Sequence, residues 1–522
     1  MAGLGVVGID RGHGAPRLAK ACLRARRRDP PPVVAFALGF AAASFYASCP
    51  ESRDPHGPPG RSLIGSCCVK PKLALLALAS TFIGCGVGHA ADAPPFKLIR
   101  SEESYAYLAG KPGSGLDSLR YIPLGPDAYV SLGGEARLRM DSFEAPRFGV
   151  GGAQGDLYGL GRLLFSADMH LGSRVRIYGQ LGLHRELEKK SPLAVSDRNG
   201  VDAQVAFIDV TPDGDRRWRL RLGRQEMTFN TTQRFVSVRE GPNVRQSFDG
   251  VRVTRQAGDL RLEAFYLHPV TIQTGAFDDS SNRDQQFYGV YASKALSEAV
   301  VLDVYAFELD RDGVRYGAVR GDERRASYGA RLAGKRGAID YEAEGVIQDG
   351  RFAGRDIRAW AGSVGGGYTL ARAWSPRAGL RFDAGSGDAD ADDNRLGTFN
   401  PLFPKGSYFN ETGLTSWSNL VAFRPSLGLA PRRDVSLELS YLLRWRQTGD
   451  DAVYLQPSTS LAPVGPERSK AVGDAIQLDA TWLVNRNLKL QGQLVHQSAG
   501  DAVRAMGGHS VDFAMLIVQA RF

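Results

Sequence analysis

The chain has 522 residues and a net charge of +9, a length that fits several soluble domains or one large barrel. The positive excess lies mostly in residues 1–90, so the rest of the chain is close to neutral and we expect no nucleic-acid partner. No apolar run after residue 91 approaches the roughly 18 residues of a spanning helix, but short strands that alternate with polar residues would escape this test.

Residues 69–90 have the pattern of a secretory signal peptide. Lys70 and Lys72 precede an apolar stretch, and Gly88 and Ala90 are the small residues expected before a cleavage site. Because a signal peptide stands at the start of a precursor, we expect residues 1–68 to be a mis-annotated N-terminal extension. All five cysteines lie in the first 85 residues, so the mature chain needs no disulfide.

Residues 91–128 show little alternation, and we expect a periplasmic N-terminal segment with some helix near residues 102–108. From Tyr129 the chain alternates polar and apolar residues with period two, which is typical of strands with one apolar face. Many of these segments have the roughly 9–11 residues that a tilted barrel strand needs. The eighteen segments are 129–140, 157–171, 174–185, 201–210, 218–225, 248–256, 260–269, 286–292, 300–309, 325–335, 339–348, 357–368, 377–383, 420–427, 435–446, 475–483, 487–498 and 509–522.

The connections between these segments alternate in length. Short ones follow even-numbered segments, and the long ones (226–247, 270–285, 384–419 and 447–474) follow odd-numbered segments. Short periplasmic turns opposite long external loops, with an even strand count, are typical of bacterial barrels. We therefore predict an all-β fold, a transmembrane antiparallel β-barrel of about 18 strands over residues 129–522, in the bacterial outer membrane.

Paired arginines indicate which face of each segment points inward. In the last segment, Leu516 and Val518 share an apolar face that suits lipid. Arg-x-Arg spacing puts both arginines on one face, and one arginine on the lipid face at midplane costs about 2–4 kcal/mol. The pairs predicted to face the lumen are Arg137/Arg139, Arg174/Arg176, Arg219/Arg221 and Arg444/Arg446. The same phase places Arg162, Arg252, Arg261, Arg331, Arg377, Arg381, Glu135, Asp168, Glu263, Glu342, Asp383 and Glu438 inside.

An arginine-lined lumen has two interpretations. Guanidinium groups bind carboxylates in bidentate fashion, and rings of arginine or lysine suit anion pores. The alternative is that these arginines pair with the inward acids and only fill the barrel. A mixture of the two is expected, since an anion must leave the channel as well as enter it.

Four stretches carry a resemblance to a known family. They are LRYIPLGPDAYVSLGGEARLR (119–139), GRQE (223–226), EGPNVRQSFDGVRV (240–253) and TFNPLFPKGSYF (398–409). Here the sequence resembles the alginate-export family of outer-membrane porins, over residues 96–522. The resemblance implies an 18-stranded barrel whose arginine-lined constriction passes a polyuronate outward. The positions it carries over are Arg137, Arg139, Arg224, Arg245 and Arg252. Asp249 shares the outward phase of Val251, so we place it at the strand rim.

We therefore expect a channel for an anionic polysaccharide in the lipid bilayer, with periplasmic export-complex proteins as candidate partners. A general anion-selective or small-solute porin is the alternative. A barrel enzyme is the third class, because His496-Gln497-Ser498 resembles the His-x-Ser of outer-membrane phospholipases, but the accompanying Asn is missing. The acidic run 388–393 lacks an EF-hand pattern, and the histidines have no metal spacing. We expect no enzymatic activity, cofactor or metal.

Overall fold

The computed structural model describes residues 94–522 except 112, 114, 215 and 216. The predictions for residues 1–68 and 69–90 therefore lie outside the described residues. No described helix is long and apolar enough to cross a membrane. The helices are η1 (Arg100–Glu102), η2 (Ala106–Leu108), η3 (Gly115–Leu119), η4 (Pro146–Gly149) and α3 (Asp501–Arg504).

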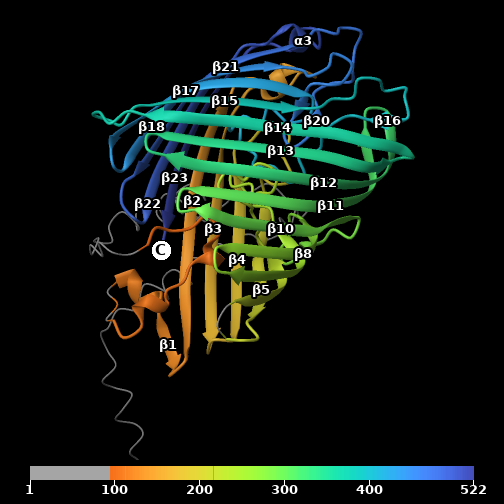
Figure 1. The fold of residues 1–522 in the computed structure, drawn as a ribbon. Coiled ribbons are helices and arrows are strands. Elements are labelled where there is room, and N and C mark those ends of the chain that lie inside the picture. The colour runs from red at the N-terminus through yellow and green to blue at the C-terminus, as the bar shows by residue number, and fades with distance from the viewer. Residues whose placement is uncertain (1–93, 112, 114, 215–216) are drawn as a thin grey trace, which may run out of the picture. The chain divides into compact units, whose positions relative to one another are not determined.

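Eighteen antiparallel strands close into a barrel (Figure 1). The barrel closes where the last strand pairs with the first, Gln519 opposite Arg137. The barrel strands are β2 (Ala128–Phe143), β3 (Asp156–Leu171), β4 (Val175–Leu187), β5 (Asn199–Val210), β6 (Trp218–Gln225), β7 (Phe248–Ala257), β8 (Leu260–Thr271), β10 (Gln285–Ser297), β11 (Val300–Tyr316), β12 (Val319–Arg336), β13 (Ile339–Phe352), β14 (Arg355–Thr369), β15 (Arg377–Gly385), β17 (Leu420–Arg432), β18 (Val435–Trp445), β21 (Ala471–Leu483), β22 (Leu488–Gln497) and β23 (Val511–Arg521). The predicted fold class is confirmed.

Small strands lie outside this wall. The N-terminal segment adds β1, which pairs with the start of β2, and the sequence did not predict it. The others border the loops. These strands are β1 (Ile122–Gly125), β9 (Ser280–Ser281), β16 (Arg395–Leu396), β19 (Tyr454–Leu455) and β20 (Thr459–Ser460).

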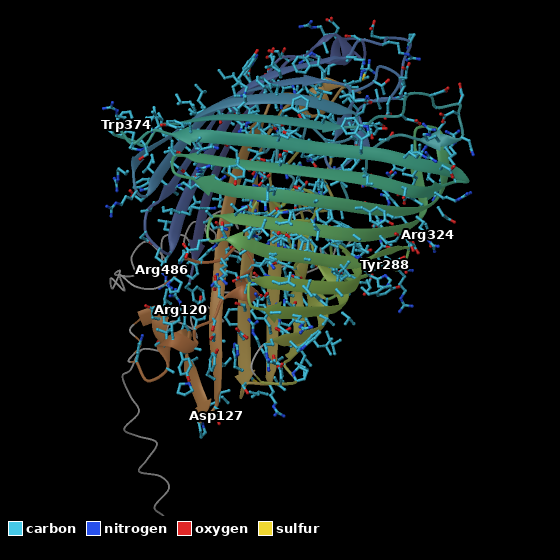
Figure 2. The ribbon with its side chains drawn as sticks, viewed as in Figure 1. Arg120, Asp127, Tyr288, Arg324, Trp374 and Arg486 are labelled. Carbon is cyan, nitrogen blue, oxygen red and sulfur yellow. The ribbon has the colours of Figure 1, made fainter. Side chains whose placement is uncertain are left out.

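The two ends of the barrel differ. One end, which we call the short-turn end, carries only the short connections after even-numbered barrel strands, and the other, the long-loop end, carries the long ones. Figure 2 labels Trp374 at the short-turn end and Arg324 near the long-loop end. The hairpins β11–β12 and β13–β14 are exceptions at the long-loop end, since each turns within two residues.

Each strand has one face inward and one outward. In β23, Leu516 is 52% exposed on the outside, whereas Ile517 is 6% exposed on the inside. The outer face carries other exposed apolar side chains, such as Leu222, Val304 and Trp360. An outer surface of this kind suits acyl chains, which cannot hydrogen-bond to polar groups.

Two connections fold into the barrel and build its core. We name residues 226–247 the first lumen segment and residues 386–419 the second lumen segment. The backbones of Phe235 and Phe403 join the two segments, since the amide of Phe403 donates to the Phe235 carbonyl at 3.0 Å. Phe229 stacks on Tyr291 of the wall with ring centroids 4.2 Å apart, and Trp417 is completely buried. Aromatic packing therefore fills the β8–β11 side of the lumen.

Candidate functional site: the lumen

The arginines of β2 bind the first lumen segment to the wall. The guanidinium of Arg137 donates to the backbone carbonyls of Glu240 and Gly241, both at 2.8 Å. Arg139 donates to the carboxylates of Asp141 at 2.8 Å and Glu411 at 2.7 Å. Glu411 belongs to the second lumen segment, so one pair of strand residues touches both segments.

Arg162 is the centre of a buried charge cluster beside these residues. It is fully buried and forms ion pairs with Glu135 of β2 and Glu240 of the first lumen segment. Burial would raise the pKa of Glu240, but Arg162 and Arg245 lower that pKa to about 2. The carboxylate of Glu240 therefore stays ionised and holds the segment against the wall.

Glu226 lies at the start of the same segment in a different environment. Its carboxylate accepts a hydrogen bond from Arg245 at 2.9 Å. Burial raises the pKa of Glu226 to about 7; the charge of Arg245 lowers this pKa, but that of Glu240 adds to the rise. The two glutamates of one segment thus titrate in separate pH ranges.

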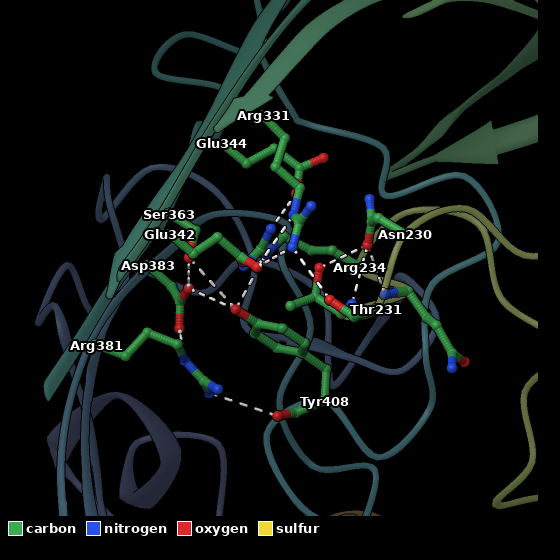
Figure 3. A network of polar contacts seen from close by, with 12 residues as sticks. Asn230, Thr231, Arg234, Arg331, Glu342, Glu344, Ser363, Arg381, Asp383 and Tyr408 are labelled. Carbon is green, nitrogen blue, oxygen red and sulfur yellow. Dashed lines mark hydrogen bonds and ion pairs between the residues drawn. The ribbon is translucent and has the colours of Figure 1, made fainter. Parts of the chain in front are cut away.

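A second network joins both lumen segments to β12–β15 (Figure 3). Arg234 pairs with Glu342 and Glu344 and donates to the Tyr408 hydroxyl at 3.1 Å. Tyr408 donates to Asp383 at 2.9 Å. Burial alone would lower the pKa of Arg234, but Tyr408, Glu344 and Glu342 raise it above its ordinary value. The arginine therefore remains charged.

The six acids that the sequence predicted to face inward all form ion pairs with arginines. Asp209, beside the predicted acids, likewise binds Arg221 at 2.7 Å and lies 3.5 Å from Arg176. Glu135, Asp168, Glu263, Glu342, Asp383 and Glu438 pair with Arg162, Arg176, Arg252, Arg331, Arg381 and Arg424, in that order. Much of the arginine lining therefore stabilises the wall, as the second interpretation held.

Cations nevertheless remain in excess. Arg444 is 1% exposed and donates to Gln497 at 2.6 Å and to Thr415 at 3.0 Å, both neutral groups. Lys405 of the second lumen segment and Lys489 of β22 are partly exposed. Among the described residues, the interior cations that form no ion pair with an acid include Arg137, Arg219, Arg239, Lys405, Arg444, Arg446 and Lys489. The lumen is thus positively biased.

Three sequence-predicted positions differ from expectation. Arg174 lies in the turn before β4 and is exposed, so it belongs to the short-turn end and not to a strand. Arg224 lies on the outer face of β6, the face of Leu222, and binds Asp249 at 2.8 Å near the long-loop end. The prediction of a lumenal Arg224 is therefore wrong, because alternation from the inward Arg221 places it on the opposite face. Arg446 follows β18 and donates to loop carbonyls, including that of Ser469.

The remaining candidates lie inside. Arg137, Arg139, Arg221, Arg245, Arg252 and Arg444 are buried in the interior, and Arg176 and Arg219 lie near the short-turn end. Sequence reasoning missed Arg234, Glu344 and Lys489. Glu344 and Lys489 share the inward phase of their strands, which was a usable signal. Arg234 lies in a loop without a period, so only the aromatic content of that loop hinted at burial.

One acidic group at the long-loop end has the spacing of a cation site. The carboxylates of Asp202, Asp278 and Asp279 offer atoms within 4.8 Å of one another. Each already accepts a hydrogen bond: from the Asp279 amide, the Gly275 amide and Asn199, respectively. Backbone amides and the Asn199 side chain thus donate to all three carboxylates.

Comparisons with known proteins agree with this architecture. The sequence profile of the family described as "Alginate export" matches residues 128–516. Among solved structures, Acinetobacter baumannii OccAB3 is similar with a TM-score of 0.52 at 12% identity, covering 75% of this chain and 99% of that chain. Acinetobacter baumannii OccAB1 gives a TM-score of 0.51 at 10% identity, with 78% and 99% covered. At these identities the likeness concerns the fold alone. No curated protein sequence matches.

Proposed function

Since this chain belongs to the alginate-export family and forms an outer-membrane channel, we propose that it passes an anionic polysaccharide of the polyuronate type through its lumen. The short-turn end then faces the periplasm, as is usual for bacterial barrels. A polyuronate carries a carboxylate on each sugar, so its passage depends on the charge of the interior.

The imbalance of interior charge carries the proposal. The predicted inward acids are neutralised by arginines, whereas Arg137, Lys405 and Lys489 have no acid partner among the described residues. Low-dielectric walls focus the field of such cations along a pore. Lysines that are partly exposed can also exchange one carboxylate for the next, which transport requires.

A second candidate function is a porin for small anions. It is favoured by the two lumen segments, whose aromatic side chains occupy the β8–β11 side of the interior. A lumen narrowed in this way suits short solutes as well as a single extended polymer chain. The two functions differ in how the channel responds to ligand length.

The test is single-channel recording in planar bilayers with the full barrel. We expect anion selectivity in a salt gradient, and current block by uronate oligomers that strengthens with oligomer length. The double variant Lys405→Gln/Lys489→Gln should weaken both the anion selectivity and the uronate block, because the interior loses two accessible charges. Lys470→Gln is the matched control, since Lys470 is exposed at the long-loop end and donates to the Gln447 carbonyl at 2.9 Å.

The possible results separate the functions. Anion selectivity with block that does not depend on oligomer length would favour the small-anion porin. Equal responses to short uronates and neutral sugars would refute polyuronate transport.

A further inference from the structure

A basic pocket lies inside the barrel at its short-turn end. Its volume is about 420 Å³, within the roughly 300–1,000 Å³ of small-molecule sites. On one side it is lined by inward-facing residues of β3–β8. On the other it is closed by residues 96–105, which we name the mouth strap. Of the interior cations named above as having no acid partner, only Arg219 lines this pocket.

The mouth strap is a built wall. Arg100 donates to the Phe522 carbonyl at 2.9 Å, and Arg176 donates to the Ser101 carbonyl at 2.7 Å. Arg245 of the first lumen segment donates to the Leu98 carbonyl at 2.8 Å, so the strap reaches into the lumen. Ile99 is 4% exposed.

The start of the strap is held by cations. Arg120 and Arg486, labelled in Figure 2, lie over the ring of Phe96 with the guanidinium carbons 5.0 and 5.3 Å from its centroid. Cation–π contacts of this kind attract arginine to an aromatic face. The pocket therefore has a defined wall on each side.

Part of the charge in the pocket is neutralised and part is not. Arg176 binds Asp168 at 2.7 Å, and Arg261 binds Glu263 at 2.6 Å. The lining acids Glu103 and Asp209 pair with Arg100 and Arg221. Lys97, Arg174 and Arg219 form no ion pair with a described acid, and the lining acid Glu102 also has no ion pair among the described residues, so unpaired cations outnumber unpaired acids in the pocket. The three cations come from three separate elements, the strap, the β3–β4 turn and β6, and all line one space.

We propose that this pocket is an entry site that binds carboxylates at the leading end of an anionic polysaccharide before it enters the lumen. The inference rests on the proposed function and adds where the polymer is first captured. Arg174 and Arg219 bind the carboxylate, since guanidinium groups match its two oxygens. Thr254 and Gln256 line the same pocket and bind sugar hydroxyls.

The proposal predicts an asymmetry between the two sides of the membrane. Cations at a pore mouth raise the arrival rate of an oppositely charged ligand by about 10-fold or more, and salt screens this effect. The capture site acts only on ligand that arrives from the periplasm. Removing its charges should therefore slow block from that side alone.

The experiment uses oriented single channels of the full barrel, with a uronate tetrasaccharide added to one side at a time. The double variant Arg174→Gln/Arg219→Gln should lower the on-rate of block from the short-turn side by about 10-fold in 0.1 M salt. The deficit should shrink in 1 M salt. Arg336→Gln is the matched control, because Arg336 is exposed at the same end and outside the pocket.

Block by uronate added from the long-loop side is the internal control, because it depends on a folded barrel and an intact lumen but not on the entry site. It should be the same in the double variant as in the unmodified channel, which would also show that the variant barrel is intact. An unchanged on-rate from the short-turn side would refute the entry site and leave the proposed function standing. An equal loss from both sides would assign these arginines to the general field of the lumen and also refute it. Absence of any uronate block in the unmodified channel would refute the proposed function, and the entry site with it.

Discussion

Replacing Arg162 by methionine should release the first lumen segment from the wall. Arg162 is fully buried between Glu135 and Glu240. After the change Glu135 keeps Arg521 at 3.0 Å, whereas Glu240 keeps one charged partner, Arg245 at 3.3 Å, and a long hydrogen bond from Gln519 at 3.4 Å. Removing one partner of a buried ion pair costs about 3–5 kcal/mol. Backbone pairing keeps β2, β3 and β4 in place, so we expect the loss of stability to appear in residues 226–247.

The size of the effect follows from this cost. Because every 1.4 kcal/mol is a factor of ten, the opening equilibrium of the segment should rise by about two to three and a half orders of magnitude. Hydrogen exchange followed by mass spectrometry in detergent measures this directly. A reporter is the amide of Gln246, which donates to the Val238 carbonyl at 2.8 Å.

A matched control separates this release from general damage to the barrel. Arg221→Met removes an equally buried arginine whose partner, Asp209, belongs to the neighbouring wall strand. It should leave exchange in residues 226–247 unchanged. Slow exchange there in Arg162→Met, or equally fast exchange in both variants, would refute the reasoning.

Two further predictions concern pH and the lipid face. The folded-state pKa of Glu226, about 7, lies above its ordinary value of 4.5, so the folded segment binds an extra proton between these values. Exchange of residues 226–247, corrected for its intrinsic pH dependence, should therefore increase from pH 5 to pH 8. Glu226→Gln should remove this pH dependence. If exchange in the variant still increases with pH, another titrating group causes the increase. Leu516→Arg places a charge at the middle of the lipid face and should cost about 2–4 kcal/mol of folding free energy, against about 0–1 for Asp512→Arg at the rim. Urea titration of folding into lipid vesicles compares the two, and equal costs would place Leu516 off the lipid face.

Local alternation was sufficient to locate the wall. The wall of a barrel is a single sheet with lipid on one side and the lumen on the other, so the polarity of each residue indicates which side it faces. Each of the eighteen predicted segments overlaps one barrel strand, and Arg137 and Leu516 have the faces that were expected. The same rule places Arg224 outside, and the prediction failed there because the family resemblance was followed in preference to the alternation.

The charge pairing and the contents of the lumen depend on contacts between distant residues. Arg139 and Glu411 are 272 positions apart, and no period relates the second lumen segment to β2. The same holds for the mouth strap, whose Leu98 meets Arg245 only because both enter the barrel. The face of a strand residue follows from the period-two alternation of its own segment. Loops and termini instead take their positions from the cavity inside the closed wall. Only the tertiary structure therefore reveals which cations remain unpaired.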